Sequence, residues 1–192
     1  MGLLRSAPGI ILAGLVAVWL TGCLPESEHP IAPVDPAKSD ARLWGSWIST
    51  EEDGYMIGHV FATEDGAMKF SVAEHGVEGL GDVETYDGHV THLASGDYLN
   101  VMVTGSETGY VIGKYEIKDK DHLSVWFPES EALEQAVKDK ALPGTVTDEG
   151  GIPDVRITAT PEQWQTFLAK APKDFFGQPT EFERVGPAYV SE

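Results

Sequence analysis

Turn-forming residues interrupt this chain at regular intervals from Leu43 onward. Short runs rich in apolar residues alternate with clusters of Gly, Asp and Ser, about every 8 to 12 residues. That spacing predicts an all-β sandwich or barrel whose strands are joined by short turns. The turn clusters lie at residues 52–54, 64–66, 87–88, 95–97, 105–109 and 118–121.

The runs between these turns each carry one apolar face. Met68, Phe70 and Val72 share a face because side chains in a strand alternate between its two sides. The same alternation recurs in three later runs, with the apolar faces Leu99, Val101 and Val103; Val111, Tyr115 and Ile117; and Leu123, Val125 and Phe127. One apolar face per strand predicts an antiparallel meander. Its predicted strands are 43–49, 55–63, 67–75, 83–93 (with a break at 87–88 left open), 98–104, 110–117 and 122–127.

Two helices are predicted after these strands. Pro128 suits the first turn of a helix at 128–142. The second helix has a sharper start, because Thr160, Pro161 and Gln163 form a capping box with proline as the first helical residue. Two further short strands are predicted around this helix, at 155–159 and 181–185.

Two short motifs lie in the first and last strands of this pattern. They are Gly45-Ser46-Trp47 and Phe182-Glu183-Arg184. With seven or so meander strands, a helix and one closing strand, they resemble the lipocalin-like family. The resemblance implies that Trp47 plugs one end of a barrel and that Arg184 lies over it in a cation–π contact. The predicted fold class is mainly β, with an antiparallel up-and-down β-barrel at 43–192 and two short helices, preceded by a signal peptide and a Pro-rich linker.

Residues 1–22 have the composition of an export signal. A stretch from Ile10 to Leu20 is apolar but shorter than the about 20 residues that span a bilayer. It runs into Leu20-Thr21-Gly22-Cys23, which resembles the lipobox of bacterial lipoproteins. The resemblance implies cleavage before Cys23, acylation of this residue and stable membrane anchoring. Because Leu24 rather than Asp follows the cysteine, it also implies the periplasmic face of the outer membrane.

Residues 23–42 are interpreted as a tether between the lipidated cysteine and the barrel. The stretch 24–40 contains four prolines and shows no apolar periodicity. A Pro-rich chain favours an extended conformation of about 3.1 Å per residue, so this stretch would reach about 50 Å.

The acidic composition limits the partners of the chain. Its formal net charge is −18 at pH 7, and such a charge is repelled by nucleic acids and by anionic lipid headgroups. Cys23 is the single cysteine, so its acylation leaves no thiol for a disulfide. We therefore expect no nucleic-acid partner and a domain held by its core alone, while protein partners stay open.

Five residues are candidates for the lining of a ligand cavity. Tyr55, His59 and Phe61 share one strand face, and this face is taken to point inward. His59 would then be either a satisfied core or rim histidine or a ligand contact. Gly113 shares a face with Tyr115 and leaves space beside it.

Metal binding and catalysis have no clear signature in the sequence. His89 and His92 are three residues apart, which places them on opposite faces of a strand. The acidic loop at 148–151 lacks the spaced ligands of a calcium site. No nucleophile elbow, phosphate loop or His-Glu-x-x-His motif occurs. We therefore expect no metal, no cofactor and no enzymatic activity.

Two functions remain open at this stage. In the first, the barrel binds a small apolar or amphipathic ligand in the cell envelope. In the second, the barrel is filled by its own side chains, and the protein is a structural or assembly accessory that acts through its surface. Cavity volume separates the two, because a ligand site needs several hundred cubic ångströms whereas a packed core has few voids larger than a water molecule.

Overall fold

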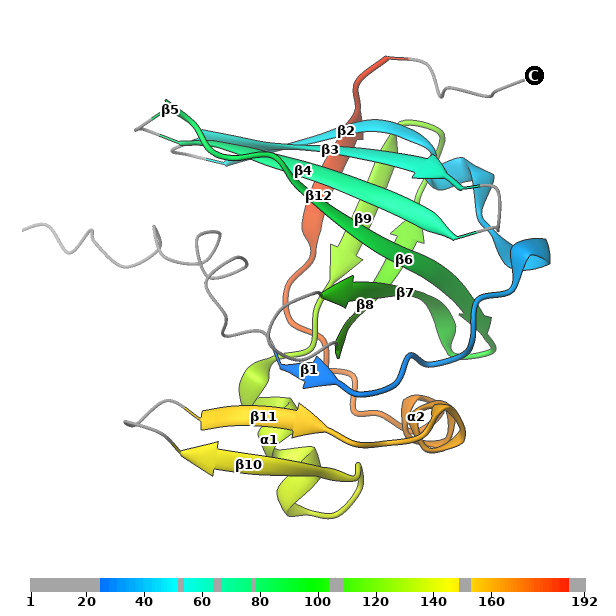
Figure 1. Ribbon diagram of the computed structural model, residues 1–192, viewed down its shortest axis with the longest axis vertical. Coiled ribbons are helices and arrows are strands. Elements are labelled where there is room, and N and C mark those ends of the chain that lie inside the picture. Colours follow the sequence, from blue (N-terminus) through cyan, green and yellow to red (C-terminus); the bar gives the residue numbers. More distant parts are fainter. Residues whose placement is uncertain are drawn as a thin grey trace, which may run out of the picture.

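The computed structural model describes residues 25–51, 54–63, 67–76, 79–103, 109–148 and 153–186. Within these ranges one sheet closes into a barrel, and a smaller layer containing both α-helices lies against its side (Figure 1). The mainly β fold, with a closed antiparallel barrel and two helices, confirms the predicted fold class. The elements are β1 (Glu26–Ser27), the 3₁₀ helices η2 (Pro36–Lys38) and η3 (Ala41–Leu43), β2 (Gly45–Glu51), β3 (Gly54–Ala62), β4 (Met68–Gly76), β5 (Gly79–Leu80), β6 (Glu84–Leu93), β7 (Gly96–Val103), β8 (Gly109–Ile117), β9 (His122–Trp126), α1 (Ser130–Lys138), β10 (Gly144–Asp148), β11 (Pro153–Ile157), α2 (Pro161–Leu168) and β12 (Thr180–Arg184).

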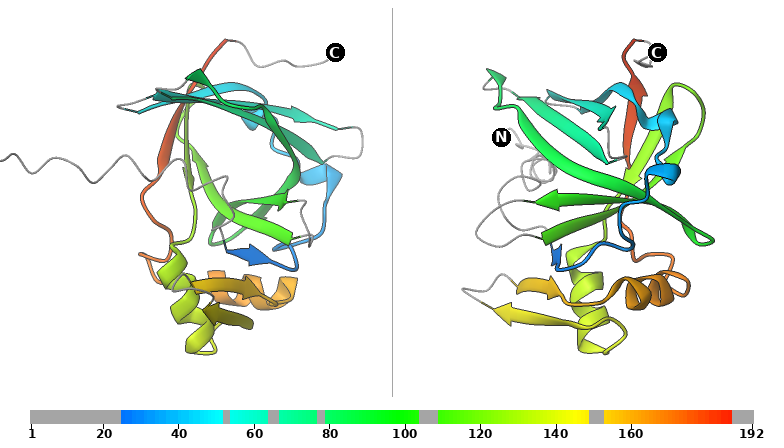
Figure 2. Two further views of the ribbon diagram at one scale, coloured as in Figure 1. Left: turned by 60° about the vertical axis from the view of Figure 1, so that its left-hand side comes forward. Right: turned by 45° about the vertical axis from the view of Figure 1, so that its right-hand side comes forward.

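The barrel has eight antiparallel strands and is closed by the last strand of the described residues. Strands β2, β3, β4, β6, β7, β8 and β9 pair in that order, and β12 inserts between β9 and β2. Arg184 of β12 is paired with Trp47 of β2, and Thr180 is paired with Val125 of β9. Figure 2 (left) shows the strands as a ring above the second layer. Closure pairs the two edges that β2 and β9 would otherwise expose.

Alternation along the strands fills the barrel interior. Met68 of β4, Leu99 of β7 and Val125 of β9 are buried in one cluster with Trp47 and Tyr115. These residues belong to the apolar faces that the sequence predicts for the three strands. Burial of apolar side chains is the main favourable contribution to the stability of such a core.

Strand β6 runs through Asp87 and Gly88 without the break that the sequence left open. Gly88 is buried, and a Cβ atom added to it would lie 2.5 Å from the Asn100 carbonyl oxygen and 2.8 Å from Phe70 Cε2. A glycine here is therefore explained by the close approach of β7 and the Phe70 ring rather than by a turn.

A second core lies outside the barrel. Tyr98 of β7 and Ile112 of β8 point away from the barrel interior and pack with Leu133 of α1 and with Trp164 and Leu168 of α2. Strand β1 extends the sheet beside β8, and β11 and β10 follow it. Strands β7 and β8 are therefore buried on both faces, which fixes the second layer on the barrel.

The described part of the predicted tether, residues 25–42, is packed on the barrel instead of extending from it. Ile31 is 0% exposed. Its backbone N–H donates to Asn100 Oδ1 at 2.7 Å, and its carbonyl accepts from Gln165 Nε2 at 2.9 Å. The Ala32 carbonyl lies 2.6 Å from His89 Nε2. Side chains of the domain thus satisfy backbone groups that a Pro-rich segment without regular structure cannot pair by itself.

The predicted signal peptide at 1–22 and the lipobox cysteine Cys23 lie outside the described residues. Among the residues that are described, no helix is long and apolar enough to cross a bilayer.

Candidate ligand cavity in the barrel

The barrel interior contains a partly open cavity of about 280 Å³. All eight barrel strands contribute to its lining, together with Glu26, Leu43 and Phe127. We call its two ends the Trp47 end, where β2 begins and β12 ends, and the Glu74 end, where β4 ends and β6 begins. Most of the lining is aliphatic or aromatic, and includes Val60, Phe70, Leu99, Val101, Val111 and Phe182.

The Trp47 end is closed by the tryptophan and arginine that the sequence singles out. The Arg184 guanidinium carbon lies 4.0 Å from the centroid of the Trp47 ring. The indole Nε1–H donates to the Leu43 carbonyl at 2.7 Å, which fixes the ring over this end. A cation over an indole face contributes about 0.5–2 kcal/mol, depending on how far it is removed from water.

Arg184 also connects three segments at this end. Its Nη1 and Nη2 donate to the carbonyls of Trp44 and Arg42, both at 2.6 Å, and its Nε donates to that of Lys120 at 2.7 Å. The planar guanidinium can reach all three because its five N–H groups point in fixed directions. One side chain therefore joins β12, the η3 segment and the turn between β8 and β9.

Tyr115 contributes to the same end through its hydroxyl group. It is buried and donates to Asp40 Oδ2 at 3.0 Å. Burial and the neighbouring Asp40 carboxylate raise the pKa of Tyr115. Burial alone would raise the pKa of Asp40, but hydrogen bonds from Arg42 and Tyr115 outweigh it and lower that pKa. A candidate cavity residue is thus a structural link between β8 and the segment before β2, and it is not among the lining residues.

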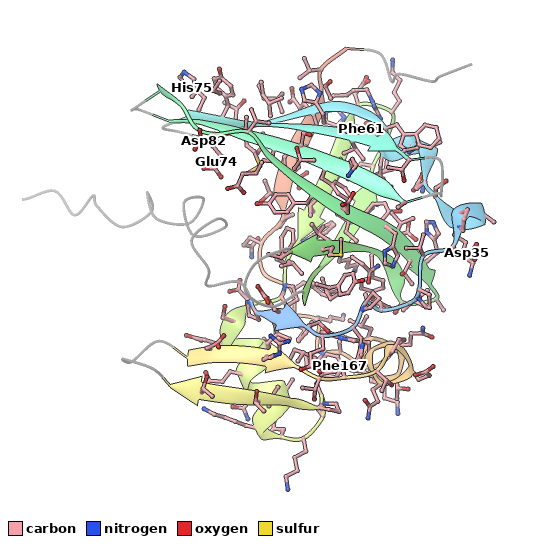
Figure 3. All side chains as sticks on the ribbon, in the orientation of Figure 1. Asp35, Phe61, Glu74, His75, Asp82 and Phe167 are labelled. Atoms are coloured by element: carbon pink, nitrogen blue, oxygen red, sulfur yellow. The ribbon has the colours of Figure 1, made fainter. Side chains whose placement is uncertain are left out.

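The Glu74 end carries the polar part of the cavity lining. Glu26, Glu74 and Tyr86 all belong to the lining. Figure 3 shows Glu74 on the barrel side of β4 and His75 on the opposite side, as strand alternation requires. The Tyr86 hydroxyl donates to Glu84. Burial, followed by this hydrogen bond, raises the pKa of Tyr86.

This arrangement suits a ligand with two chemically different ends. The apolar walls favour an apolar body, because its burial removes surface from water. The carboxylates at the Glu74 end accept hydrogen bonds and attract positive charge. An amphipathic molecule with a hydrogen-bond donor or a cation at one end matches both parts.

The predicted inward face of β3 is the outer face. Phe61 is 45% exposed, and the Tyr55 ring stacks on His75, with ring centroids 4.7 Å apart. His59 touches the cavity boundary, but its side chain is exposed and its Nδ1 lies 2.8 Å from Ser46 Oγ. The inward residues are instead Met56, Gly58 and Val60. Both faces of β3 carry large apolar residues, so alternation alone does not identify the inner one.

Gly113 lies beside the cavity lining but is not part of it. A Cβ atom added there would meet Phe127 Cε1 at 3.2 Å and the Trp126 carbonyl oxygen at 3.4 Å. The space next to this glycine is therefore occupied by the Phe127 ring. Gly58 is the glycine of the cavity lining, and a Cβ atom added to it meets no atom within 4 Å.

Sequence reasoning also missed Glu74 and Tyr86. The signal was present for Glu74, because it continues the alternating series of Met68, Phe70 and Val72 by one more step. Tyr86 is paired with Phe70 across the sheet and shares its side. Extending the apolar face of Met68 to the end of its strand would have included Glu74, whereas no apolar face was identified for the strand that contains Tyr86.

The histidines on β6 make separate structural contacts. His92 Nδ1 lies 2.7 Å from Asp97 Oδ1, and its Nε2 lies 3.0 Å from the Lys38 carbonyl oxygen. His89 is buried on the outer face of the barrel, where its ring contacts Tyr110 edge-on. Within the described ranges, no group of three or more His, Cys, Asp or Glu side chains is placed to hold a metal ion.

Acid should destabilise the fold through His89. Burial lowers the pKa of His89 in the folded protein, whereas an unfolded chain has an ordinary histidine pKa of about 6.5. The unfolded state then binds a proton at a higher pH than the folded state, so stability falls as the pH drops from about 7.5 through 6.5. We expect the free energy of unfolding in urea to fall over this interval by less in His89→Gln than in the unmodified protein.

His122 provides the internal comparison for this experiment. Its hydrogen bond with Asp119 raises its pKa, so its contribution is present at low pH and is lost as the pH rises. His122 is present in both the unmodified protein and the His89→Gln variant. Its contribution to the pH dependence of stability therefore cancels when the two proteins are compared. An identical pH dependence of the two proteins would contradict the role given to His89.

Together, the fold and the cavity define the class of this protein: a closed eight-stranded antiparallel barrel with a mainly apolar interior cavity and an outer layer of helices and strands. No protein-family model, curated protein or solved structure matches the chain. The chemistry of the cavity and the N-terminal sequence are therefore the basis for the function.

Proposed function

We propose that this protein is a lipid-anchored lipoprotein of the bacterial cell envelope whose barrel binds a small amphipathic ligand without catalysing a reaction. The observation that carries the proposal is the cavity of about 280 Å³ inside the barrel. This volume is close to the lower limit of ligand sites, which is about 300 Å³, and far above the voids of a packed core. It favours the binding module over the filled barrel of a structural accessory.

The lining supports the chemical class of the ligand. Aliphatic and aromatic side chains surround most of the cavity, while Glu26, Glu74 and Tyr86 contribute polar atoms at one end. An apolar body of modest size fits the walls, and a donor or cationic group fits the carboxylates. The ligand would be a small amphiphile whose polar end lies at the Glu74 end.

The envelope location rests on the N-terminal sequence. The apolar segment and the run Leu20-Thr21-Gly22-Cys23 resemble a lipoprotein signal and lipobox. The proposed anchor holds the barrel on the periplasmic face of the outer membrane. Two or more acyl chains give stable anchoring, whereas one chain binds only marginally.

Replacing Cys23 by serine should abolish the anchor. Cells that express the unmodified chain and are fed a clickable palmitate analogue should yield a labelled protein in the membrane fraction. The Cys23→Ser variant should carry no label and should leave the membrane or remain uncleaved. An unlabelled wild-type chain would refute the anchor.

Filling the cavity should abolish ligand binding while the fold is retained. Gly58 faces the cavity, and a side chain at this position starts in open space. Gly58→Leu should therefore remove binding of a neutral fluorescent probe such as 1-aminoanthracene, which the unmodified domain should bind at one per chain. Its free energy of unfolding should not fall, because a glycine inside a strand costs about 0.5–1 kcal/mol relative to alanine.

Gly76 provides the matched control at the end of β4. A Cβ atom added to Gly76 also meets no atom within 4 Å, but this glycine is not part of the cavity lining. Gly76→Leu should leave probe binding unchanged. Failure of the unmodified domain to bind any apolar or amphipathic probe, or equal binding by Gly58→Leu, would favour the structural accessory.

A further inference from the structure

The N-terminal segment begins at the Glu74 end of the barrel. Ser27 of β1 is paired with Tyr110, the second residue of β8, and β8 starts at this end. Glu26 belongs to the cavity lining, and its side chain lies against Gly109. The chain that connects to Cys23 therefore leaves the domain beside the polar end of the cavity.

Chain geometry then limits the distance between the anchor and the cavity. Cys23 is three residues before Glu26. A fully extended chain spans at most about 3.6 Å per residue, so the two Cα atoms are within about 11 Å of each other. A long tether is excluded, because residues 25–42 are packed on the domain. Acyl chains on Cys23 would hold the Glu74 end close to the bilayer surface.

The same end also exposes apolar side chains. Leu80 and Val83 are each 66% exposed, more than any other large hydrophobic residue in the described ranges. Leu80 is paired with His75 near the end of β4, and Val83 directly precedes β6. In Figure 1, β5 lies at the upper left of the barrel and β1 lies below the barrel, so the exposed pair and the segment that leads to Cys23 lie on opposite sides of this end.

We propose that the Glu74 end of the barrel faces the membrane, with Leu80 and Val83 in contact with lipid, and that the cavity exchanges a membrane amphiphile directly with this bilayer. The proposal rests on the lipid anchor of the proposed function. In this proposal the surface formed by Leu80 and Val83 binds lipid. The ligand comes from the same membrane that holds the anchor.

Charge sets the kind of bilayer that this surface accepts. Asp82 lies between the two exposed apolar residues, and Glu84 follows them. The Gly81 N–H donates to the Glu74 carbonyl at 2.8 Å, which places Asp82 beside β4 at this end, where Figure 3 labels both residues. Carboxylates are repelled by anionic headgroups within about 8–10 Å at physiological salt. Contact should therefore be strongest on zwitterionic lipid and should weaken as anionic lipid is added.

The test uses the lipid-modified protein and single introduced cysteines. Because acylation occupies the only native cysteine, Leu80→Cys and Phe61→Cys can each be labelled with the environment-sensitive dye NBD. Phe61 is 45% exposed near the Trp47 end and serves as the matched control. In phosphatidylcholine vesicles, the dye at position 80 should show a blue-shifted emission and should be quenched by doxyl-labelled lipid. The dye at position 61 should show neither change.

A second measurement follows ligand exchange and does not depend on the dye. Transfer of a fluorescent amphiphile from the vesicle into the anchored protein should be slowed by Leu80→Asp and unaffected by Phe61→Asp. Mass spectrometry first establishes whether Cys23 is acylated. If it is acylated and positions 80 and 61 respond equally, the proposed orientation is wrong but the lipid anchor is not affected. An unmodified Cys23 would instead overturn the anchor, and the inference with it.

Discussion

Trp47→Ala should lower the free energy of unfolding by about 3–5 kcal/mol, the range for removal of a large buried aromatic side chain. The Trp47 side chain is 1% exposed and lies at the end of the barrel core beside Leu43 and Leu123. Its loss also removes the hydrogen bond to the Leu43 carbonyl. Urea unfolding followed by far-UV circular dichroism measures the change.

A double-mutant cycle isolates the contact between Trp47 and Arg184. The free energy of coupling should be about 0.5–2 kcal/mol, because the guanidinium lies over the indole face and is partly removed from water. Arg184→Lys is the matched variant, since it keeps the charge but loses the planar group that reaches three carbonyls. A coupling of zero would mean that the two residues stabilise the Trp47 end independently.

Ile31→Ala should destabilise the domain by about 2–5 kcal/mol, the range for removing most of a buried aliphatic side chain. Ile31 belongs to the outer core with Tyr98 and Trp164. Val34 lies three residues later in the same segment and is 45% exposed. Val34→Ala should therefore change stability by less than about 0.5 kcal/mol.

Amide hydrogen exchange gives an independent measure of the same contact. The Ile31 N–H donates to the buried side chain of Asn100, so it should be protected as strongly as the barrel core. In Ile31→Ala this protection should decrease, together with that of β1. Similar effects of Ile31→Ala and Val34→Ala, with fast exchange at residue 31, would restore the interpretation of this segment as a tether.

The barrel strands could be predicted because the alternation of apolar and polar residues lies within each strand. Met68, Phe70 and Val72 alternate with polar residues, and a strand with one apolar face can bury only that face. β3 lacks this asymmetry, because Tyr55, Ile57 and Phe61 are as apolar as Met56 and Val60. Its inner face is determined by its pairing with β2 and β4. The sequence of β3 alone does not indicate this pairing.

The N-terminal segment could not be predicted, because its partners are distant in sequence. Asn100 and Gln165, which bind the backbone of Ile31, are 69 and 134 residues away. A segment with four prolines and one buried isoleucine has the composition of a linker. β10 was missed for a related reason, since Val146 is the only large apolar residue among its five residues.

The cavity could be predicted only in part, unlike the barrel strands, which could be predicted, and the N-terminal segment, which could not. The sequence indicates an apolar barrel interior, but a volume depends on how well side chains from opposite walls meet. Gly58 leaves open space in the wall, whereas the space beside Gly113 is taken by Phe127. Both are glycines within predicted strands, and the difference between them comes from tertiary packing.

The position of β12 has a consequence for the order of folding. Among the described strands β12 is synthesised last, yet it lies between β2 and β9, and Arg184 is paired with a residue 137 positions earlier. Until residues 180–184 are available, β2 and β9 keep unpaired edges that could join another chain. Contacts of such long sequence separation also form slowly. We therefore expect a chain that ends before residue 180 to aggregate through these two edges, and ring closure to be the late step that makes the barrel soluble.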